Sequence, residues 1–188
     1  MKVIKKNSLI NSFIFSKICV GSSMAYTDPT NFDVLFGYRK SLFALINPFS
    51  FQYSLKTCFI FLESFVKNKY DFIFIVDIQD SILFDKFYQV CKKKQYTLLK
   101  GSEMSTGFLT NKKIENTVII TIFLNHRKTE LIQKEALLTN IPLISFSDLT
   151  SNKFSSSFYV TGNYNSFLSQ NLILTLLSLC LEQKHEYS

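Results

Sequence analysis

Glycine, proline, alanine and arginine are scarce in this chain, and tryptophan is absent. Its 188 residues include 5 Gly, 3 Pro, 3 Ala and 2 Arg. Gly101 and Gly107 form the only close pair of glycines, and neither G-x-G-x-x-G nor a G-x-x-x-x-G-K-[ST] loop occurs. The G-x-S-x-G turn of α/β hydrolases is missing as well. These absences argue against a nucleotide-binding enzyme and against a hydrolase of the familiar kinds.

Cysteine and histidine are also too few and too scattered to suggest a metal site. His126 and His185 complete no ligand set with the thiols, so we expect no zinc and no other cofactor. No C-x-x-C pair occurs, and widely spaced thiols of this kind are typical of small buried apolar groups rather than of disulfides. The four thiols are Cys19, Cys58, Cys91 and Cys180.

Two groups of polar residues have the residue types of a catalytic or metal site. His126, Ser147 and Asp148 all follow expected strands, and we interpret them as a polar rim on an apolar sheet rather than as a catalytic triad. Asp77, Asp80 and Asp85 lie around Ser81 at the start of an expected helix, where carboxylates cap free backbone N–H groups, so we favour capping over magnesium binding. The sequence therefore predicts no catalytic residue and no enzyme.

Phenylalanine, tyrosine and lysine are abundant instead. The chain has 20 Phe and 9 Tyr, and its abundant residues are those written with A/T-rich codons. This skew is typical of an A/T-rich genome such as that of an organelle, and it leads us to expect nearly all of the Phe in the core. The formal charge of +7 suits a polyanionic partner such as nucleic acid.

The first 25 residues resemble a secretory signal in outline, because lysines precede an apolar stretch that ends in small residues. Asn7, Asn11 and Lys17 interrupt that stretch, so we expect a retained basic arm over residues 1–31 before one α/β domain over residues 32–188. The apolar run at 172–181 is shorter than the ~20 residues that a bilayer requires. We expect no transmembrane segment.

Apolar runs of strand and helix length alternate from residue 55 onward. The spacing predicts helices over 55–67, 81–94, 128–139 and 165–181. Strands are expected over 71–76, 96–99, 116–124, 141–146 and 158–160. This alternation predicts a three-layer αβα fold with a mostly parallel sheet, of the flavodoxin- or Rossmann-like kind.

Four short motifs then follow one another in a familiar order. Residues 36–40 (FGYRK) with Asn47–Pro48 resemble H-F-G-H-x-x-x-x-W-N-P, and residues 107–111 (GFLTN) resemble G-G-M-L-T-N. Glu135–Ala136 with 141–144 (IPLI) and Asp148 is similar to E-A…I-P-V-I-x-x-x-D-T, and 158–163 (FYVTGN) with Ser166 to Y-x-I-P-G-N-D-x-x-x-x-S. Together these motifs resemble the ribosomal protein S-two family over residues 32–181.

The resemblance implies a structural protein of the small ribosomal subunit that binds rRNA and neighbouring ribosomal proteins in translation, with no membrane partner and no small-molecule substrate. The helical hairpin usual after L-T-N is missing, which together with the composition favours a reduced, organelle-encoded version, mitochondrial rather than plastid. Gly107 and Asn111 are expected in a tight turn. The side chains expected to contact RNA are Arg39, Lys40, Lys100, Asn111, Lys112, Lys113, Arg127, Lys128, Lys153 and Asn163.

Two other hypotheses remain open at this point. A small Rossmann-like nucleotide-binding protein or enzyme predicts a ligand pocket at the strand ends. A secreted or membrane-surface protein predicts cleavage near Ala25.

Overall fold

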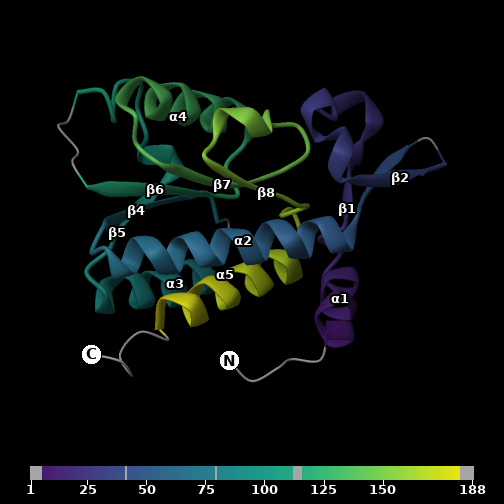
Figure 1. The fold of residues 1–188 in the computed structure, drawn as a ribbon, viewed down its shortest axis with the longest axis horizontal. Helices are drawn as coiled ribbons and strands as arrows, with labels where there is room; N and C mark the ends of the chain where they lie inside the picture. Colours follow the sequence, from purple (N-terminus) through teal and green to yellow (C-terminus); the bar gives the residue numbers. More distant parts are fainter. Residues whose placement is uncertain (1–5, 41, 79, 112–115, 183–188) are drawn as a thin grey trace.

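The computed structural model describes residues 6–40, 42–78, 80–111 and 116–182, and Figure 1 shows how they are arranged. The α-helices are α1 (Lys6–Phe15), α2 (Pro48–Lys67), α3 (Ser81–Lys93), α4 (His126–Thr139) and α5 (Phe167–Glu182). The strands are β1 (Val20–Ser23), β2 (Leu35–Arg39), β3 (Phe43–Ile46), β4 (Asp71–Val76), β5 (Thr97–Lys100), β6 (Thr117–Ile122), β7 (Leu143–Ser147) and β8 (Phe158–Thr161). Short 3-10 helices are η1 (Met24–Tyr26), η2 (Pro29–Val34), η3 (Gly101–Glu103) and η4 (Lys153–Ser155).

The main sheet has five parallel strands in the order β5-β4-β6-β7-β8. From β4 the chain adds β5 on one side, then crosses back to add β6, β7 and β8 on the other. The direction of winding therefore reverses between β4 and β6, which makes this the switch point where open α/β sheets bind ligands. The predicted α/β fold with a parallel sheet is confirmed.

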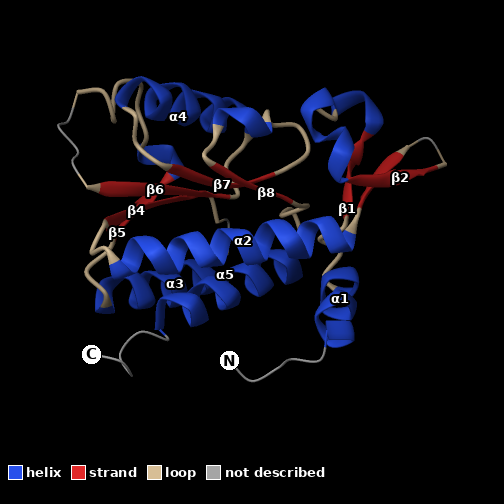
Figure 2. Cartoon of the chain, viewed as in Figure 1, coloured by secondary structure: helices blue, strands red, loops and turns tan. Residues whose placement is uncertain are grey.

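Helices cover the two faces of this sheet unequally (Figures 1 and 2). Helices α2, α3 and α5 lie together on one face, and α4 lies on the other with the coil that follows β5. Between β5 and β6 the described residues include the 3-10 helix η3 and no α-helix. The face that carries α4 is therefore the thinner of the two layers.

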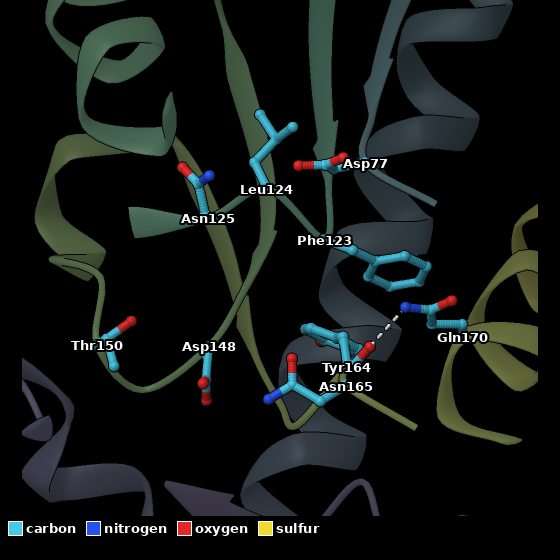
Figure 3. Close-up of a pocket in the computed structure, with 9 residues that line it drawn as sticks. All are labelled: Asp77, Phe123, Leu124, Asn125, Asp148, Thr150, Tyr164, Asn165 and Gln170. Atoms are coloured by element: carbon cyan, nitrogen blue, oxygen red, sulfur yellow. Dashed lines mark hydrogen bonds between the residues drawn. The ribbon is translucent and has the colours of Figure 1, made fainter. Parts of the chain in front are cut away.

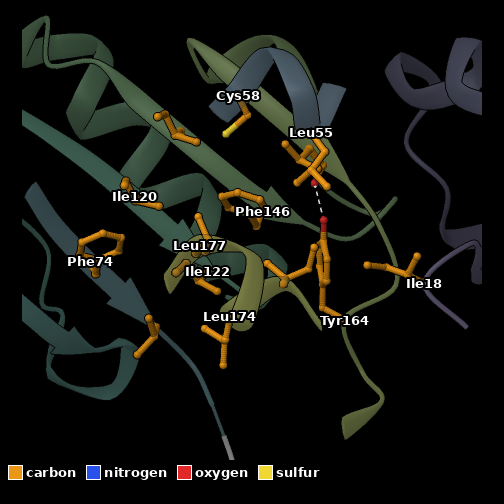
Figure 4. Close-up of a cluster of buried hydrophobic side chains, with 14 of the residues drawn as sticks. Ile18, Leu55, Cys58, Phe74, Ile120, Ile122, Phe146, Tyr164, Leu174 and Leu177 are labelled. Atoms are coloured by element: carbon orange, nitrogen blue, oxygen red, sulfur yellow. Dashed lines mark hydrogen bonds between the residues drawn. The ribbon is translucent and has the colours of Figure 1, made fainter. Parts of the chain in front are cut away.

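The larger core lies between the sheet and the three-helix layer. Phe74, Ile120 and Phe146 come from β4, β6 and β7, and they pack toward Leu174 and Leu177 of α5 (Figure 4). All six residues of β6 are buried, as expected for a strand covered on both faces. Within the described residues, no helix combines the length and the apolar content that crossing a membrane requires.

Polar caps set the starts of the helices. Asn47 accepts a hydrogen bond from Phe49 N (3.0 Å), and Pro48 occupies the first turn, so α2 starts at residue 48 rather than at the expected 55. Asp80 accepts from Leu83 N (3.0 Å) and caps α3, as predicted. Strand β6 ends at Ile122, two residues early, because Phe123 takes a left-handed conformation with φ 60°.

The segment before α2 forms a second, antiparallel sheet in the order β1-β3-β2, which the sequence did not predict. Phe13 and Ile18 belong to the main core, and the Phe13 ring meets that of Phe51 edge to face with centroids 5.0 Å apart. Part of the segment 6–31 thus packs into the main core. The expected division into an arm and a domain at residue 31 stays a prediction.

The expectation that nearly all phenylalanines lie in the core is wrong. Seven of the 20 are exposed, five of them between residues 15 and 49. Phe15 is 79% exposed and Phe36 is 76% exposed. The exposed rings are those of Phe15, Phe32, Phe36, Phe43, Phe49, Phe154 and Phe167.

Candidate functional site

The carboxyl ends of the five parallel strands lie along one edge of the main sheet, and a pocket of about 390 Å³ opens there (Figure 3). The pocket lies beyond the ends of β4, β6 and β7, at the switch point of the winding. Its volume is in the range of small-molecule sites. The residues that line it are Asp77, Phe123, Leu124, Asn125, Asp148, Thr150, Tyr164, Asn165 and Gln170.

Phe123 and Tyr164 form an aromatic wall of this pocket, with ring centroids 4.9 Å apart and planes tilted by 34°. The Tyr164 hydroxyl donates to Val160 O (2.9 Å), and the Gln170 side chain donates to Tyr164 O (2.8 Å). A Cβ atom on Gly162 would lie 2.8 Å from the Tyr164 ring, so the ring can lie here only because residue 162 is glycine. Packing and hydrogen bonds therefore hold the wall in place.

The two carboxylates of the pocket have different surroundings. Asp77 forms an ion pair with Lys128, with Oδ2 and Nζ 3.3 Å apart. Asp148 accepts a hydrogen bond from Leu149 N (2.7 Å), and among the described residues no cationic side chain pairs with it. Burial raises the pKa of the Asp148 carboxyl, and the hydrogen bond from Leu149 lowers it by less. The pocket is therefore acidic overall.

On the thinner face, one glutamate joins two of the sequence motifs. Glu135 of α4 accepts hydrogen bonds from Gly107 N at Oε1 (2.6 Å) and from Leu109 N at Oε2 (2.9 Å). Asn111 N donates to Gly107 O (2.9 Å), and Gly107 has φ 84°, so residues 107–111 form the predicted tight turn. The carboxylate of the E-A motif thus holds the backbone of the GFLTN motif.

The N-terminal segment is joined to the carboxyl ends of β7 and β8 by a buried amide. Asn31 is fully buried, and its Nδ2 donates to Leu149 O (2.9 Å) and Ser151 O (2.8 Å). Its Oδ1 accepts from the Thr161 hydroxyl (3.4 Å). Sequence reasoning missed Asn31, because its partners lie more than a hundred residues away and no local pattern marks it.

Some of the side chains predicted to contact RNA are engaged within the protein. Lys128 is in the ion pair with Asp77, and Lys153 Nζ lies 2.5 Å from Asp33 Oδ2. The Asn163 side chain donates to Val20 O. Their charges or amides are therefore partly satisfied by other groups of the protein.

The other described members of the set are exposed and do not form one patch. Arg39 and Lys40 lie at the β2–β3 hairpin, which belongs to the small antiparallel sheet and not to the main sheet. Lys100 ends β5 with its ammonium 4.8 Å from the centre of the Phe84 ring, and Arg127 lies in the first turn of α4. Exposed Asn111 closes the turn described above. Lys112 and Lys113 lie outside the described residues.

A second group of lysines gathers at the opposite, amino edge of the sheet. Helices α2 and α3 both end there, just before the adjacent strands β4 and β5 begin. Four of these five lysines are exposed, and none has an ion-pair partner among the described residues. The group consists of Lys67, Lys69, Lys92, Lys93 and Lys94. The Lys92–Lys94 run was visible in the sequence, but its proximity to Lys67 and Lys69 depends on strand pairing.

The polar residues that could suggest a catalytic or metal site do not form such a site in the described part of the chain. Ser147 is buried, with its hydroxyl 2.5 Å from Ser145 Oγ. The side chain of His126 lies outside the described part. Across the described ranges, no three His, Cys, Asp or Glu side chains are placed to hold a metal ion. Burial raises the pKa of the Cys19 thiol to about 11 and that of Cys91 to about 12, so both stay protonated at neutral pH.

Comparisons with known proteins add no relative. A scan against models of protein families found no match to this chain. A search of curated proteins likewise found no related sequence.

Proposed function

We propose that this chain is a non-catalytic, RNA-binding constituent of the small ribosomal subunit of an organelle, most simply the mitochondrion. Four short motifs along the sequence resemble those of the ribosomal protein S-two family. The observation that supports the proposal best is the contact between two of them, in which the Glu135 carboxylate binds the amides of Gly107 and Leu109. Two motifs that are separate in the sequence therefore meet in the folded chain.

The charge distribution supports an RNA partner and suggests where RNA binds. The lysine group at the amino edge of the sheet presents ammonium groups without ion-pair partners among the described residues, whereas Asp77 and Asp33 neutralise Lys128 and Lys153 near the carboxyl edge. Phosphate contacts from lysine and arginine supply most of the sequence-independent affinity for nucleic acids. The amino edge is therefore the better phosphate surface, in addition to the exposed cations predicted from the sequence.

The exposed aromatic rings of residues 15–49 support a place inside an assembly. Phe15, Tyr26 and Phe36 are each more than 70% exposed. Large exposed apolar groups gathered in one segment are typical of surfaces that a partner covers. A ribosomal protein meets this condition, because rRNA and neighbouring proteins surround it.

The rival function is nucleotide binding at the strand-end pocket, and the position of the pocket at the switch point favours it. The chemistry of the residues around the pocket argues against nucleotide binding. The turn after β4 carries Asp77 and Asp80 in place of glycines, and Asp148 lines the same pocket, so phosphate groups would meet carboxylates there. A phosphate cradle requires converging backbone amides or cations instead.

The proposal is tested by the affinity of the purified chain for small-subunit rRNA, measured across a series of salt concentrations. A variant that carries K67Q, K69Q, K92Q and K93Q should bind more weakly. Its slope of log affinity against log salt should fall by roughly 0.7 for each phosphate of single-stranded RNA that the substitutions leave without a lysine. A second variant, K100Q with R127Q, measures the contribution of the cations predicted from the sequence.

Lys56 and Lys86 provide the matched control, because they are exposed on α2 and α3 away from both edges. K56Q with K86Q should leave the slope almost unchanged. Equal effects per charge in all three variants would show that only net charge matters, and would contradict a defined RNA surface.

A further inference from the structure

The strand-end pocket is lined by a carboxylate without a cationic partner among the described residues, by an aromatic wall and by side-chain amides. The Asp148 carboxylate has no cationic partner among the described residues, and it accepts a hydrogen bond from Leu149 N. The rings of Phe123 and Tyr164 form one wall of the same cavity, and the side chains of Asn125 and Asn165 also line it (Figure 3). The chain as a whole carries a formal charge of +7, so this acidic pocket is a local exception.

A guanidinium group matches these features better than other common ligands. Its planar fork donates to carboxylate and amide oxygens and stacks on aromatic rings. Phosphate is repelled by the Asp148 charge, which no cationic side chain of the described residues offsets. A neutral base can stack on Phe123 but leaves the Asp148 charge uncompensated, and an ammonium lacks the flat face that would stack on the ring.

We infer that the pocket between Asp148, Phe123 and Asn125 receives an arginine side chain from a neighbouring protein. Charge complementarity favours a basic protein segment at this edge, while RNA phosphates are drawn to the lysines at the opposite edge of the sheet. That the neighbour is another protein of the small subunit rests on the proposed function. The preference for a guanidinium group rests on the pocket alone.

The inference is tested by NMR titration of the full, purified chain with N-acetylarginine amide, N-acetyllysine amide and adenosine. The arginine probe should shift the side-chain amide signals of Asn125 and Asn165, and should bind about tenfold more tightly than the lysine probe. D148N should weaken arginine binding by about tenfold. The matched control D85N, on an exposed site of α3, should leave it unchanged.

A second variant keeps the test decisive if D148N does not fold. Asn125 caps α4 by accepting from Lys128 N (3.0 Å), and aspartate caps helices equally well, so N125D should fold and add a carboxylate to the pocket. N125D should then bind the arginine probe severalfold more tightly. Adenosine binding in preference to arginine, or arginine binding that neither variant changes, would overturn the inference.

The two proposals fail in distinguishable ways. If the chain binds rRNA but its pocket ignores the arginine probe, only the pocket inference is wrong. If the pocket binds arginine but the chain ignores rRNA, the proposed function fails and the pocket remains a site for an arginine-bearing partner.

Discussion

The Glu135 side chain binds two backbone amides of the turn at residues 107–111. Its two carboxylate oxygens accept from Gly107 N and Leu109 N, which fixes the turn against α4. E135A leaves two partly buried amides without these partners, which should lower the free energy of unfolding by about 2–3 kcal/mol. Urea denaturation measures the difference.

The matched control is K134A, one residue earlier and exposed on the same helix. It should change the stability by less than about 0.5 kcal/mol. Equal effects of E135A and K134A would show that the turn does not depend on the carboxylate.

Asp148 gives a prediction about pH. Burial raises its pKa in the folded chain above the value of about 3.9 for a free carboxyl. The folded state therefore holds the proton more tightly, and the stability falls as the pH rises from the unfolded pKa through the folded one. D148N keeps a side-chain oxygen that can accept from Leu149 N, but it replaces the ionisable carboxyl group with a neutral amide.

We therefore expect D148N to be more stable than the natural chain at pH 7, with the difference shrinking as the pH falls toward about 4. Thermal melts at several pH values measure this. A D148N chain that is less stable at pH 7 would show that the charge is compensated in the folded state.

At the scale of elements, Asn31 ties the N-terminal segment to the main sheet. N31A removes the donor to Leu149 O and Ser151 O in a fully buried position, which should cost about 2–4 kcal/mol. Hydrogen exchange should rise first in η2, which this contact joins to the β7–β8 loop. A uniform rise over the whole chain would mean that the segment and the sheet unfold as one unit.

The main-sheet elements were predictable from the sequence, and the small sheet was not. Strands β4 and β6 are continuous apolar runs, and α3 follows a capping aspartate, so local patterns identify them. Strands β1 and β3 have four residues each and pair across twenty or more positions. Short strands whose pairing depends on distant partners leave no periodic signal in the sequence.

At the scale of the whole molecule, the alternation of strands and helices predicted the parallel sheet, but the placement of charges was not predictable. The sequence marked Lys128 and Lys153 as cations for RNA, while folding brings each beside an aspartate. The lysine group at the amino edge and the acidic pocket at the carboxyl edge emerge only when parallel strands align their ends. Composition could likewise not place the exposed rings of residues 15–49.

Those rings lead to a prediction about the isolated chain. With Phe15, Phe36 and Tyr26 more than 70% exposed, the purified protein should self-associate without RNA once salt screens its net positive charge. Analytical ultracentrifugation with and without small-subunit rRNA measures this. A chain that stays monomeric at high concentration without RNA would argue against a surface that needs a partner.

The most direct test of a ribosomal role is sedimentation of native organelle extract through a sucrose gradient at high magnesium, with immunodetection of this chain. We expect it to migrate with small-subunit rRNA, to stay there in moderate salt and to leave after ribonuclease treatment. Recovery only at the top of the gradient would contradict a ribosomal constituent, and the strand-end pocket would then be the place to search for a ligand.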